Sequence, residues 1–413
     1  MYKVWIIAGL ALLSLHTQGQ TGNSPYSSLG VGDVYSGATI TNSGMGHVGV
    51  GTFSNLHVNY LNPALLSHTT WTSFEFSVWG EYKQLKKEGI SQRQATGNLN
   101  QIILSLPILT NRYVIAMGMR PLSLVNYSSA YSKNLNSSDV ANYTMNGSGG
   151  LNTLFLSQGI KLSSHILIGL QGSYIFGTIR KSGSVTSKPM IGGYTVESVQ
   201  ESNYRGFSVK PGLSFESKLK KDIAMVIGLT SELTTPLTVK DNFFGQHKDA
   251  VGNIITSDTL LKEKTTALSY PQNISAGISL YKGSQWLIGG DFSFQDWSSF
   301  KNLSNDILTT SYTIGIGGEM TPNAGSTTYL NRVTYRTGIQ VKKTPFIVNG
   351  ESIYDYQFTL GASLPVTRLS YINLALNVGQ RGIAKDALIQ EQYIRFIVGV
   401  SFNDRWFVRR KYD

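Results

Sequence analysis

The sequence from position 354 reads Tyr354-Asp355-Tyr356-Gln357-Phe358-Thr359-Leu360-Gly361-Ala362-Ser363-Leu364, and apolar and polar side chains alternate along it. Because successive side chains of a β-strand point to opposite faces, this alternation predicts a strand with one aromatic, apolar face and one polar face. The same pattern recurs at 329–341, 372–378 and 393–402. The chain is therefore expected to be all-β.

The length of these runs favours a membrane barrel over a soluble sandwich, which alternates in the same way. Many runs extend over about 10 residues, the length that a tilted strand needs to cross a bilayer. Their apolar faces carry Tyr or Phe near the ends, as in the aromatic girdles of outer-membrane barrels. In lipid an open sheet edge leaves backbone groups without partners, so the sheet has to close. We expect fourteen strands, an even number that lets both termini lie on the periplasmic side, at 70–84, 97–107, 112–130, 148–163, 165–180, 198–219, 222–234, 262–281, 285–295, 306–320, 328–342, 352–365, 370–380 and 391–403.

Connections of two kinds join these runs. Long loops are expected at 181–201 and 242–262, and short turns are expected at 109–111, 163–164, 219–222 and 282–284. Short periplasmic turns and long extracellular loops are typical of outer-membrane barrels. The predicted fold class is thus a transmembrane antiparallel β-barrel of about 14 strands, located in the outer membrane of a Gram-negative bacterium.

Composition argues against several other classes of protein. The chain has no cysteine, which excludes a disulfide scaffold, a lipid anchor on an N-terminal cysteine and a cysteine-based zinc site. No apolar run beyond the N-terminus reaches the length of about 18 residues that a transmembrane helix needs. The net charge of +11 is scattered along the chain, so we expect no nucleic-acid partner.

No constellation of catalytic or metal-binding residues stands out. The 6 histidines are not spaced as metal pairs, and neither a Gly-x-Ser-x-Gly elbow nor a nucleotide-binding loop occurs. We therefore expect no catalytic residues, no metal and no cofactor, although an outer-membrane esterase stays open as an alternative.

The N-terminal part differs from the rest of the chain. Residues 1–20 are predicted to be a cleaved signal peptide, because Lys3 precedes a short apolar run that small or polar residues follow. Residues 21–69 do not alternate and are rich in glycine, with apolar anchors such as Tyr26. They are expected to form a hatch, a plug inside the barrel lumen, with a flexible tail as the alternative. The barrel itself is expected to comprise residues 70–413.

Three motifs follow one another along the chain. The first is Asn62-Pro63-Ala64 at the end of the glycine-rich segment, and the second is Ala116-Met117-Gly118-Met119-Arg120-Pro121 in the third expected strand. The third is Asp296-Trp297-Ser298-Ser299-Phe300, which follows a strand. Together they resemble the FadL-type outer-membrane transporters of long-chain fatty acids and other hydrophobic compounds. Residues 405–413 depart from that family's pattern, so the chain looks like a divergent branch.

The resemblance implies passive uptake of a hydrophobic compound, which leaves the barrel sideways through a gap at a kinked third strand. Asn62, Pro63 and Ala64 would then be the hinge of the hatch, and Gly118 and Pro121 the kink of the lateral gate. A proline cannot donate a ladder hydrogen bond, which fits a bulge in the wall or a position where pairing has already ended. Expected partners are a fatty acid-like molecule, outer-membrane lipid or lipopolysaccharide, and other outer-membrane proteins.

Two arginines are candidates for the lumen. Arg332 and Arg336 lie on the polar face of the run 329–341, so both are expected to point inward. There they would bind a carboxylate of the ligand or pair with a hatch acid such as Asp33.

A second class of function stays open, a non-transporting barrel that is a subunit of an outer-membrane secretion or protein-assembly complex. A transporter predicts an apolar cavity between hatch and loops. A complex subunit predicts a filled lumen and an apolar patch outside the lipid belt.

Overall fold

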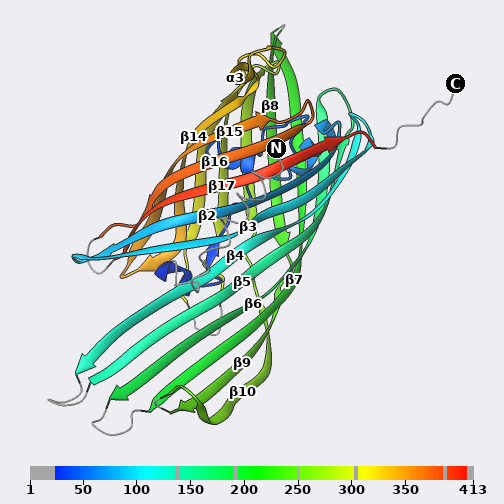
Figure 1. Ribbon diagram of the computed structural model, residues 1–413. Coiled ribbons are helices and arrows are strands. Elements are labelled where there is room, and N and C mark those ends of the chain that lie inside the picture. Colours follow the sequence, from blue (N-terminus) through cyan, green and yellow to red (C-terminus); the bar gives the residue numbers. More distant parts are fainter. Residues whose placement is uncertain are drawn as a thin grey trace, which may run out of the picture.

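Fourteen antiparallel strands form one closed barrel, which confirms the predicted fold class (Figure 1). The computed structural model describes residues 24–134, 140–188, 194–220, 222–249, 251–301, 306–384 and 388–406. The barrel closes where β17 (Gln390–Asp404) pairs with β2 (Thr72–Lys87). The strands between them are β3 (Ile90–Leu109), β4 (Tyr113–Asn134), β5 (Val140–Lys161), β6 (Ile166–Lys188), β7 (Thr195–Lys220), β8 (Ile223–Thr234), β9 (Leu237–Lys248), β10 (Ile254–Leu268), β11 (Asn273–Lys282), β12 (Trp286–Asp296), β13 (Thr310–Met320), β14 (Thr334–Val348), β15 (Glu351–Pro365) and β16 (Ser370–Arg381).

Two strands of the barrel are interrupted. β8 and β9 lie end to end beside β7, and β11 and β10 lie end to end beside β8 and β9. Pro236 and Pro271 stand in the two breaks. A proline lacks the N–H that a central strand needs, so pairing stops at both places.

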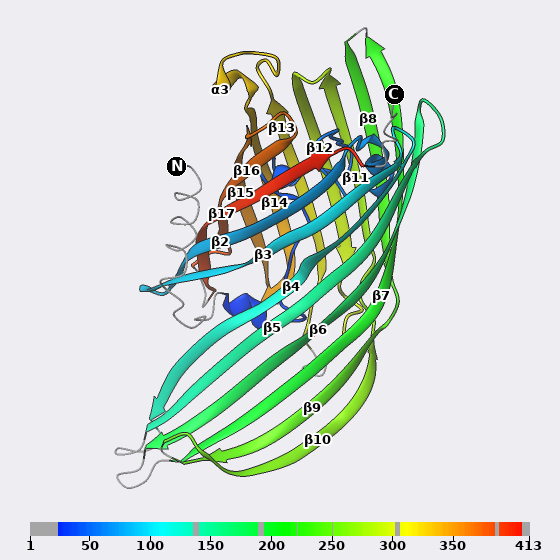
Figure 2. The same cartoon turned by 45° about the vertical axis from the view of Figure 1, so that its right-hand side comes forward.

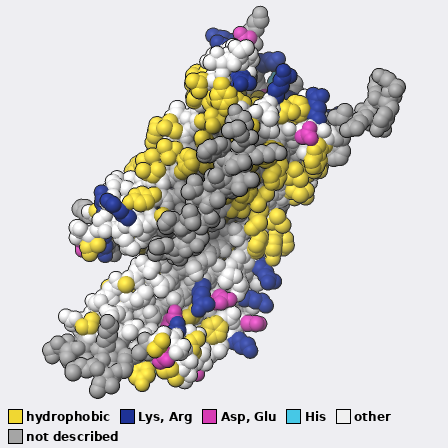
Figure 3. Space-filling model, viewed as in Figure 1, with side chains coloured by type: hydrophobic (Ala, Val, Ile, Leu, Met, Phe, Trp, Pro, Cys, Tyr) yellow, Lys and Arg dark blue, Asp and Glu magenta, His cyan; other side chains and the backbone are white. Residues whose placement is uncertain are grey.

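The outward face of the wall is apolar and the inward face is polar. On β2, Phe74, Phe76 and Val78 are exposed, whereas Glu75 and Ser77 are buried. Figure 3 shows hydrophobic side chains gathered over the upper part of the molecule, and mostly polar and charged side chains over the lower part. Among the described residues no helix is long and apolar enough to span a bilayer. The band of outward apolar side chains on a closed barrel places the protein in the outer membrane.

One side of the barrel extends far beyond the other. The distal halves of β4, β5, β6 and β7 pair with one another and with β9 and β10, and form a curved sheet that we call the projecting wall (Figure 2). The expectation of long loops at 181–201 and 242–262 is wrong, because strands occupy most of both segments. These strands lie beyond the lipid belt, so they lack the apolar alternation that marks a membrane strand.

Residues 24–69, which precede β2, fold inside the barrel. They contain η1 (Pro25–Ser28), β1 (Asp33–Val34), α2 (Ile40–Ser43) and η2 (Pro63–His68), joined by irregular segments. Most of their side chains are buried, so this segment is a folded plug and not a flexible tail. We call residues 24–69 the hatch. The predicted signal peptide lies outside the described residues.

Candidate functional site

A ring of glycines on the inner wall faces the hatch. A Cβ on Gly228 would lie 2.7 Å from the carbonyl carbon of Val50, and one on Gly338 would lie 2.8 Å from the Cα of Gly46. Real Cβ atoms essentially never approach other atoms so closely, so glycine is needed for the hatch to lie directly against the wall. The glycine ring comprises Gly159, Gly169, Gly212, Gly228, Gly277, Gly315, Gly317, Gly338 and Gly361.

Hydrogen bonds from wall side chains also hold the hatch backbone. The Asp291 carboxylate on β12 accepts from the N–H groups of Gly49 and Val50, at 2.6 and 2.7 Å. The Thr359 hydroxyl on β15 accepts from the N–H of Gly46 at 2.7 Å. Buried backbone groups need such partners, so displacing the hatch would carry the free-energy penalty of leaving them unpaired.

Charged side chains of the wall meet the hatch in one buried network. Arg381 lies 2.7 Å from the hatch residue Asp33, 3.3 Å from Asp355 and 3.7 Å from Glu391. Lys83 pairs with Glu391 at 3.0 Å. Burial by itself would raise the pKa of Asp33, but the positive charges of Arg381 and Lys83 outweigh it and lower that pKa below its ordinary value. Asp33 is therefore a charged anchor of the hatch.

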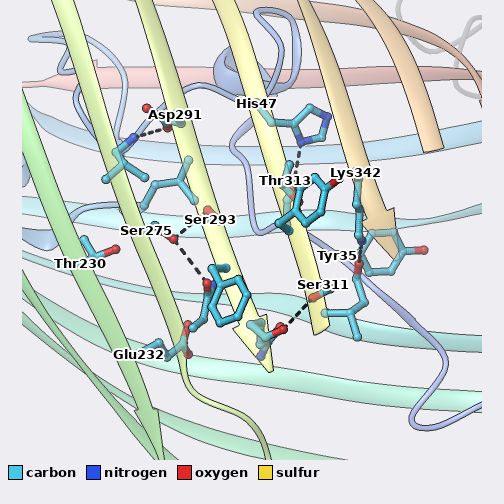
Figure 4. Close-up of a pocket in the computed structure, with 18 of the residues that line it drawn as sticks. Tyr35, His47, Thr230, Glu232, Ser275, Asp291, Ser293, Ser311, Thr313 and Lys342 are labelled. Atoms are coloured by element: carbon cyan, nitrogen blue, oxygen red, sulfur yellow. Dashed lines mark hydrogen bonds between the residues drawn. The ribbon is translucent and has the colours of Figure 1, made fainter. Parts of the chain in front are cut away.

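Two small cavities remain between hatch and wall. The larger measures about 130 Å³, and Figure 4 shows His47, Glu232, Asp291 and Lys342 among its lining residues. The smaller measures about 80 Å³ and is also lined by charged groups, among them Arg395. Ligand pockets typically measure roughly 300–1,000 Å³ and are mostly apolar. Neither cavity has the volume that a long hydrocarbon chain needs.

An apolar cluster occupies the space on the distal side of the hatch. It joins Tyr26 and Val31 of the hatch to Trp297 and Phe300 from the connection between β12 and β13, and to wall residues such as Ile175. The Trp297 and Phe300 rings lie 5.5 Å apart, centroid to centroid. A transporter was expected to have an apolar cavity between the hatch and the loops. Side chains of the protein itself fill this space instead.

Backbone pairing in the wall is interrupted between β3 and β4. Pairing of the two strands ends at Ile102 with Met119, and beyond this point the strands diverge (Figure 1). The hatch occupies the vacated edge of β4, where β1 pairs with it at Leu124 and the N–H of Ser24 donates to the carbonyl of Asn126 at 3.0 Å. We call this interruption of the pairing the slit. Part of the hatch therefore pairs with one of the two edges that border the slit.

The three residues expected to form a hinge are packed tightly against the wall. Asn62 caps η2, because its side chain accepts from the N–H of Ala64 at 3.1 Å and donates to the carbonyls of Val50 and Leu213 at 3.0 and 3.1 Å. Pro63 and Ala64 are buried against glycines of β5 and β6. These residues fix the hatch in the structure, and a hinge motion about them stays a prediction.

The two residues expected to form the kink lie on β4 at the start of the slit. The pairing register of β4 with β5 shifts between Pro121 and Ser123, which is a β-bulge. Gly118 lies against Phe155, since a Cβ on Gly118 would be 2.8 Å from the Phe155 Cζ atom. The strand therefore bends at the expected place, and its role as a lateral gate stays a prediction.

Of the two arginines expected in the lumen, Arg336 faces inward. It donates to the Glu319 carboxylate at 2.8 Å and to the Ser363 hydroxyl at 2.6 Å, both on neighbouring strands. Its partner acid is thus in the wall, whereas the hatch acid Asp33 pairs with Arg381.

The expectation for Arg332 is wrong. Tyr329–Arg332 is the short helix α3 at the end of the barrel, and β14 begins only at Thr334. The Arg332 guanidinium lies over the Tyr329 ring, 5.5 Å from its centroid. The alternation in the sequence continues through this turn, so the strand was predicted to begin at 328 although it begins at Thr334.

Sequence reasoning missed Arg381, Asp291 and the glycine ring. Arg381 directly follows the predicted strand 370–380, and the alternation places it on the polar face of that strand. This position could have identified it as a lumen residue. Asp291 occupies a polar-face position in another predicted strand. Glycines inside strands often mark the close approach of another backbone, and this rule could have found the ring.

Three solved structures share this fold over nearly the whole chain. The CymD monoaromatic hydrocarbon channel is 12% identical with a TM-score of 0.56, over 92% of this chain and 99% of that chain. The toluene transporter TodX of P. putida is 12% identical with a TM-score of 0.57, over 91% and 100%. A FadL homologue of Pseudomonas aeruginosa is 10% identical with a TM-score of 0.54, over 89% and 98%. At such identities the likeness shows the fold alone.

The resemblance to FadL-type proteins therefore holds for the architecture of the barrel. No curated protein matches the chain. A family model with the description BamG matches residues 1–413, which is the whole sequence. The chain, with its FadL-type fold and its tightly held hatch, belongs to the BamG family.

Proposed function

We propose that this protein is a closed barrel subunit of a multiprotein assembly in the outer membrane, where it serves as a scaffold rather than as a channel. The observation that carries this proposal is the filled lumen. The glycine ring lets the hatch lie directly against the wall, and the cavities between them measure about 130 and 80 Å³. These volumes are too small to hold a long hydrophobic solute while the hatch is docked.

The projecting wall supports the same proposal. The projecting wall extends past the apolar belt of the barrel. Its strands therefore do not help to span the membrane and need another role. Such an extension offers a large surface to other proteins at the end of the barrel opposite the start of β2 and the end of β17. A scaffold needs this kind of surface, whereas a pore does not.

The proposal is tested on the full-length protein extracted from native membranes. In a mild detergent, light scattering should give a molar mass above that of one barrel, and a harsher detergent should reduce the mass to one barrel. In planar bilayers the purified protein should not conduct. A single-barrel mass in every detergent, together with uptake of hydrophobic compounds by cells that carry the protein, would refute the proposal.

The slit favours a second candidate function, passive uptake of a hydrophobic compound such as a long-chain fatty acid. The neighbouring structures are described as hydrocarbon channels and toluene transporters, and β3 and β4 part beside the bulge at Pro121. In this candidate the hatch moves and the solute leaves sideways through the slit. The tightly packed hatch and the small cavities favour the first proposal.

Uptake by transport-deficient cells separates the two candidates. The second predicts that the protein restores uptake of a labelled long-chain fatty acid or of toluene, and that Pro121→Val reduces it while heat-modifiable gel migration stays intact. The change is made at Pro121 alone, because a Cβ at Gly118 would collide with Phe155. No uptake by the unaltered protein would exclude the second candidate for these compounds.

A further inference from the structure

The projecting wall has two lateral edges, and they differ. One is the part of β4 from 127 to 134, and the other is β10. In the described part of the chain, this part of β4 pairs only with β5, and β10 pairs only with β9. Each edge therefore presents backbone N–H and C=O groups that no strand occupies. Natural proteins usually protect such edges against unwanted pairing.

The β10 edge carries the usual protections. Its pairing with β9 shifts register three times, and Glu263 adopts a positive φ of 46°. Charged side chains are dense on it, with Lys262, Glu263 and Lys264 in succession. Bulges and charges of this kind twist an edge and repel an added strand.

The β4 edge carries fewer of these protections. Its pairing with β5 continues without a shift from Ser123 to Asn134. Residues 127–134 contain no proline and a single charge, Lys133, and the side chains from 128 onward are exposed. A regular, exposed edge with one charge is a template for a further strand.

The hatch already uses the neighbouring part of the same edge. β1 pairs with β4 at Ser123 and Leu124, and the N–H and C=O groups of Asn126 bond to Ser27 and Ser24 of the hatch. Because backbone direction alternates along a strand, the N–H and C=O groups of Ala130 and of its neighbours at 128 and 132 also point to this edge. An added strand thus has a preformed row of partners beyond the hatch.

An apolar row begins at this edge and crosses the concave face of the wall. Tyr131, Tyr143, Val185 and Val196 lie in register on β4, β5, β6 and β7, and the two tyrosine rings stack at 4.8 Å. Tyr131 is 53% exposed and Val196 is 50% exposed. Side chains of this size are seldom left exposed in a row unless a partner covers them. The row lies on the same face of the wall as Val125, which belongs to the apolar cluster on the distal side of the hatch.

We propose that the β4 edge from 127 to 134 receives an extended strand of another protein of the assembly. This inference rests on the proposed scaffold function and names the surface through which it acts. The added strand continues the line of the hatch segment, bonds to the free backbone groups of β4, and places apolar side chains beside Tyr131 on the concave face. The bulged and charged β10 edge stays unpaired.

A proline at Ala130 tests the proposal with a matched control. Ala130→Pro removes one edge N–H without removing a bond to β5, because that N–H points away from β5. Ala130→Val enlarges the same side chain and keeps the N–H. Both variants should fold, as heat-modifiable gel migration will report. Hydrogen exchange on the native assembly should show the edge N–H groups of Ser128 and Ser132 protected in the unaltered protein and in Ala130→Val, and at least tenfold less protected in Ala130→Pro.

A photo-crosslinking residue in place of Ser128 identifies the occupant in intact cells. The expected adduct joins β4 to one peptide of another protein, and it is lost in Ala130→Pro and kept in Ala130→Val. An adduct between two copies of this chain would overturn the proposal in favour of self-association. Unprotected N–H groups of Ser128 and Ser132 in an assembly that stays larger than one barrel would overturn it and leave the scaffold function standing. If no assembly exists in mild detergent, the scaffold function fails with it.

Discussion

Adding two methyl groups to the glycine ring should release the hatch. A Cβ at Gly228 would overlap the carbonyl oxygen of Val50, and one at Gly338 would overlap the backbone nitrogen of Gly46, whereas ordinary contacts begin at 3.4 Å. The hatch would have to move by more than about 1 Å at each site. Overpacking of this kind costs about 1–3 kcal/mol per site. The double variant Gly228→Ala with Gly338→Ala should thus weaken hatch docking by roughly 2–6 kcal/mol if the sites add.

Conductance and protease access measure the displacement. In planar bilayers the double variant should conduct where the unaltered protein is closed, and cells that carry it should become sensitive to large antibiotics. Limited proteolysis should cut the hatch of the variant while the barrel keeps its heat-modifiable migration. Gly172→Ala is the matched control, since a Cβ at this wall glycine meets no atom within 4 Å. A double variant that stays closed and protease-resistant would refute the idea that close backbone contact holds the hatch.

Two further predictions concern charge in the lumen. Arg381→Gln removes the buried partner of Asp33 and Asp355 and should destabilise hatch docking by about 3–5 kcal/mol. The melting temperature should fall and proteolysis of the hatch should become faster. The control Arg332→Gln on α3 should change neither quantity. Burial lowers the pKa of His47 to about 3, because the docked hatch holds its imidazole in the neutral form. The docked state is therefore stabilised in full above the ordinary histidine pKa of about 6.5, and this stabilisation is lost as the pH falls toward 3. Hatch proteolysis should therefore accelerate over that interval, and a His47→Gln variant that shows the same pH dependence would contradict this assignment.

The membrane strands could be predicted because lipid imposes a strict pattern on them. In the run from Tyr354 to Leu364, each outward side chain has to be apolar, and the structure places these residues on β15 as expected. The hatch could be recognised as the one long segment without alternation. The pairing of Asp33 with an arginine was also foreseeable, although its partner is Arg381.

Elements outside the lipid escaped prediction because lipid does not constrain their sequence. The strands of the projecting wall around 181–201 meet water, so their polar residues looked like a loop. The turn at Arg332 was missed because alternation continues by chance through α3. The alternation in the run from Tyr354 to Leu364 correctly placed Gly361 on the inward face. It could not show what Gly361 contacts, because a glycine that faces water and one that faces the hatch backbone occupy the same position in the pattern. Only the contact between Gly361 and Gly44 distinguishes them.

The glycine ring also bears on the order in which the protein folds. The hatch precedes every wall strand in the chain, and glycines from β5 to β15 surround it closely. Synthesis therefore produces the hatch first, and pairing of β17 with β2 completes the enclosure last. The close fit between hatch and wall glycines is a property of the finished barrel. A variant that loosens this fit, such as the double variant above, should therefore still close its wall.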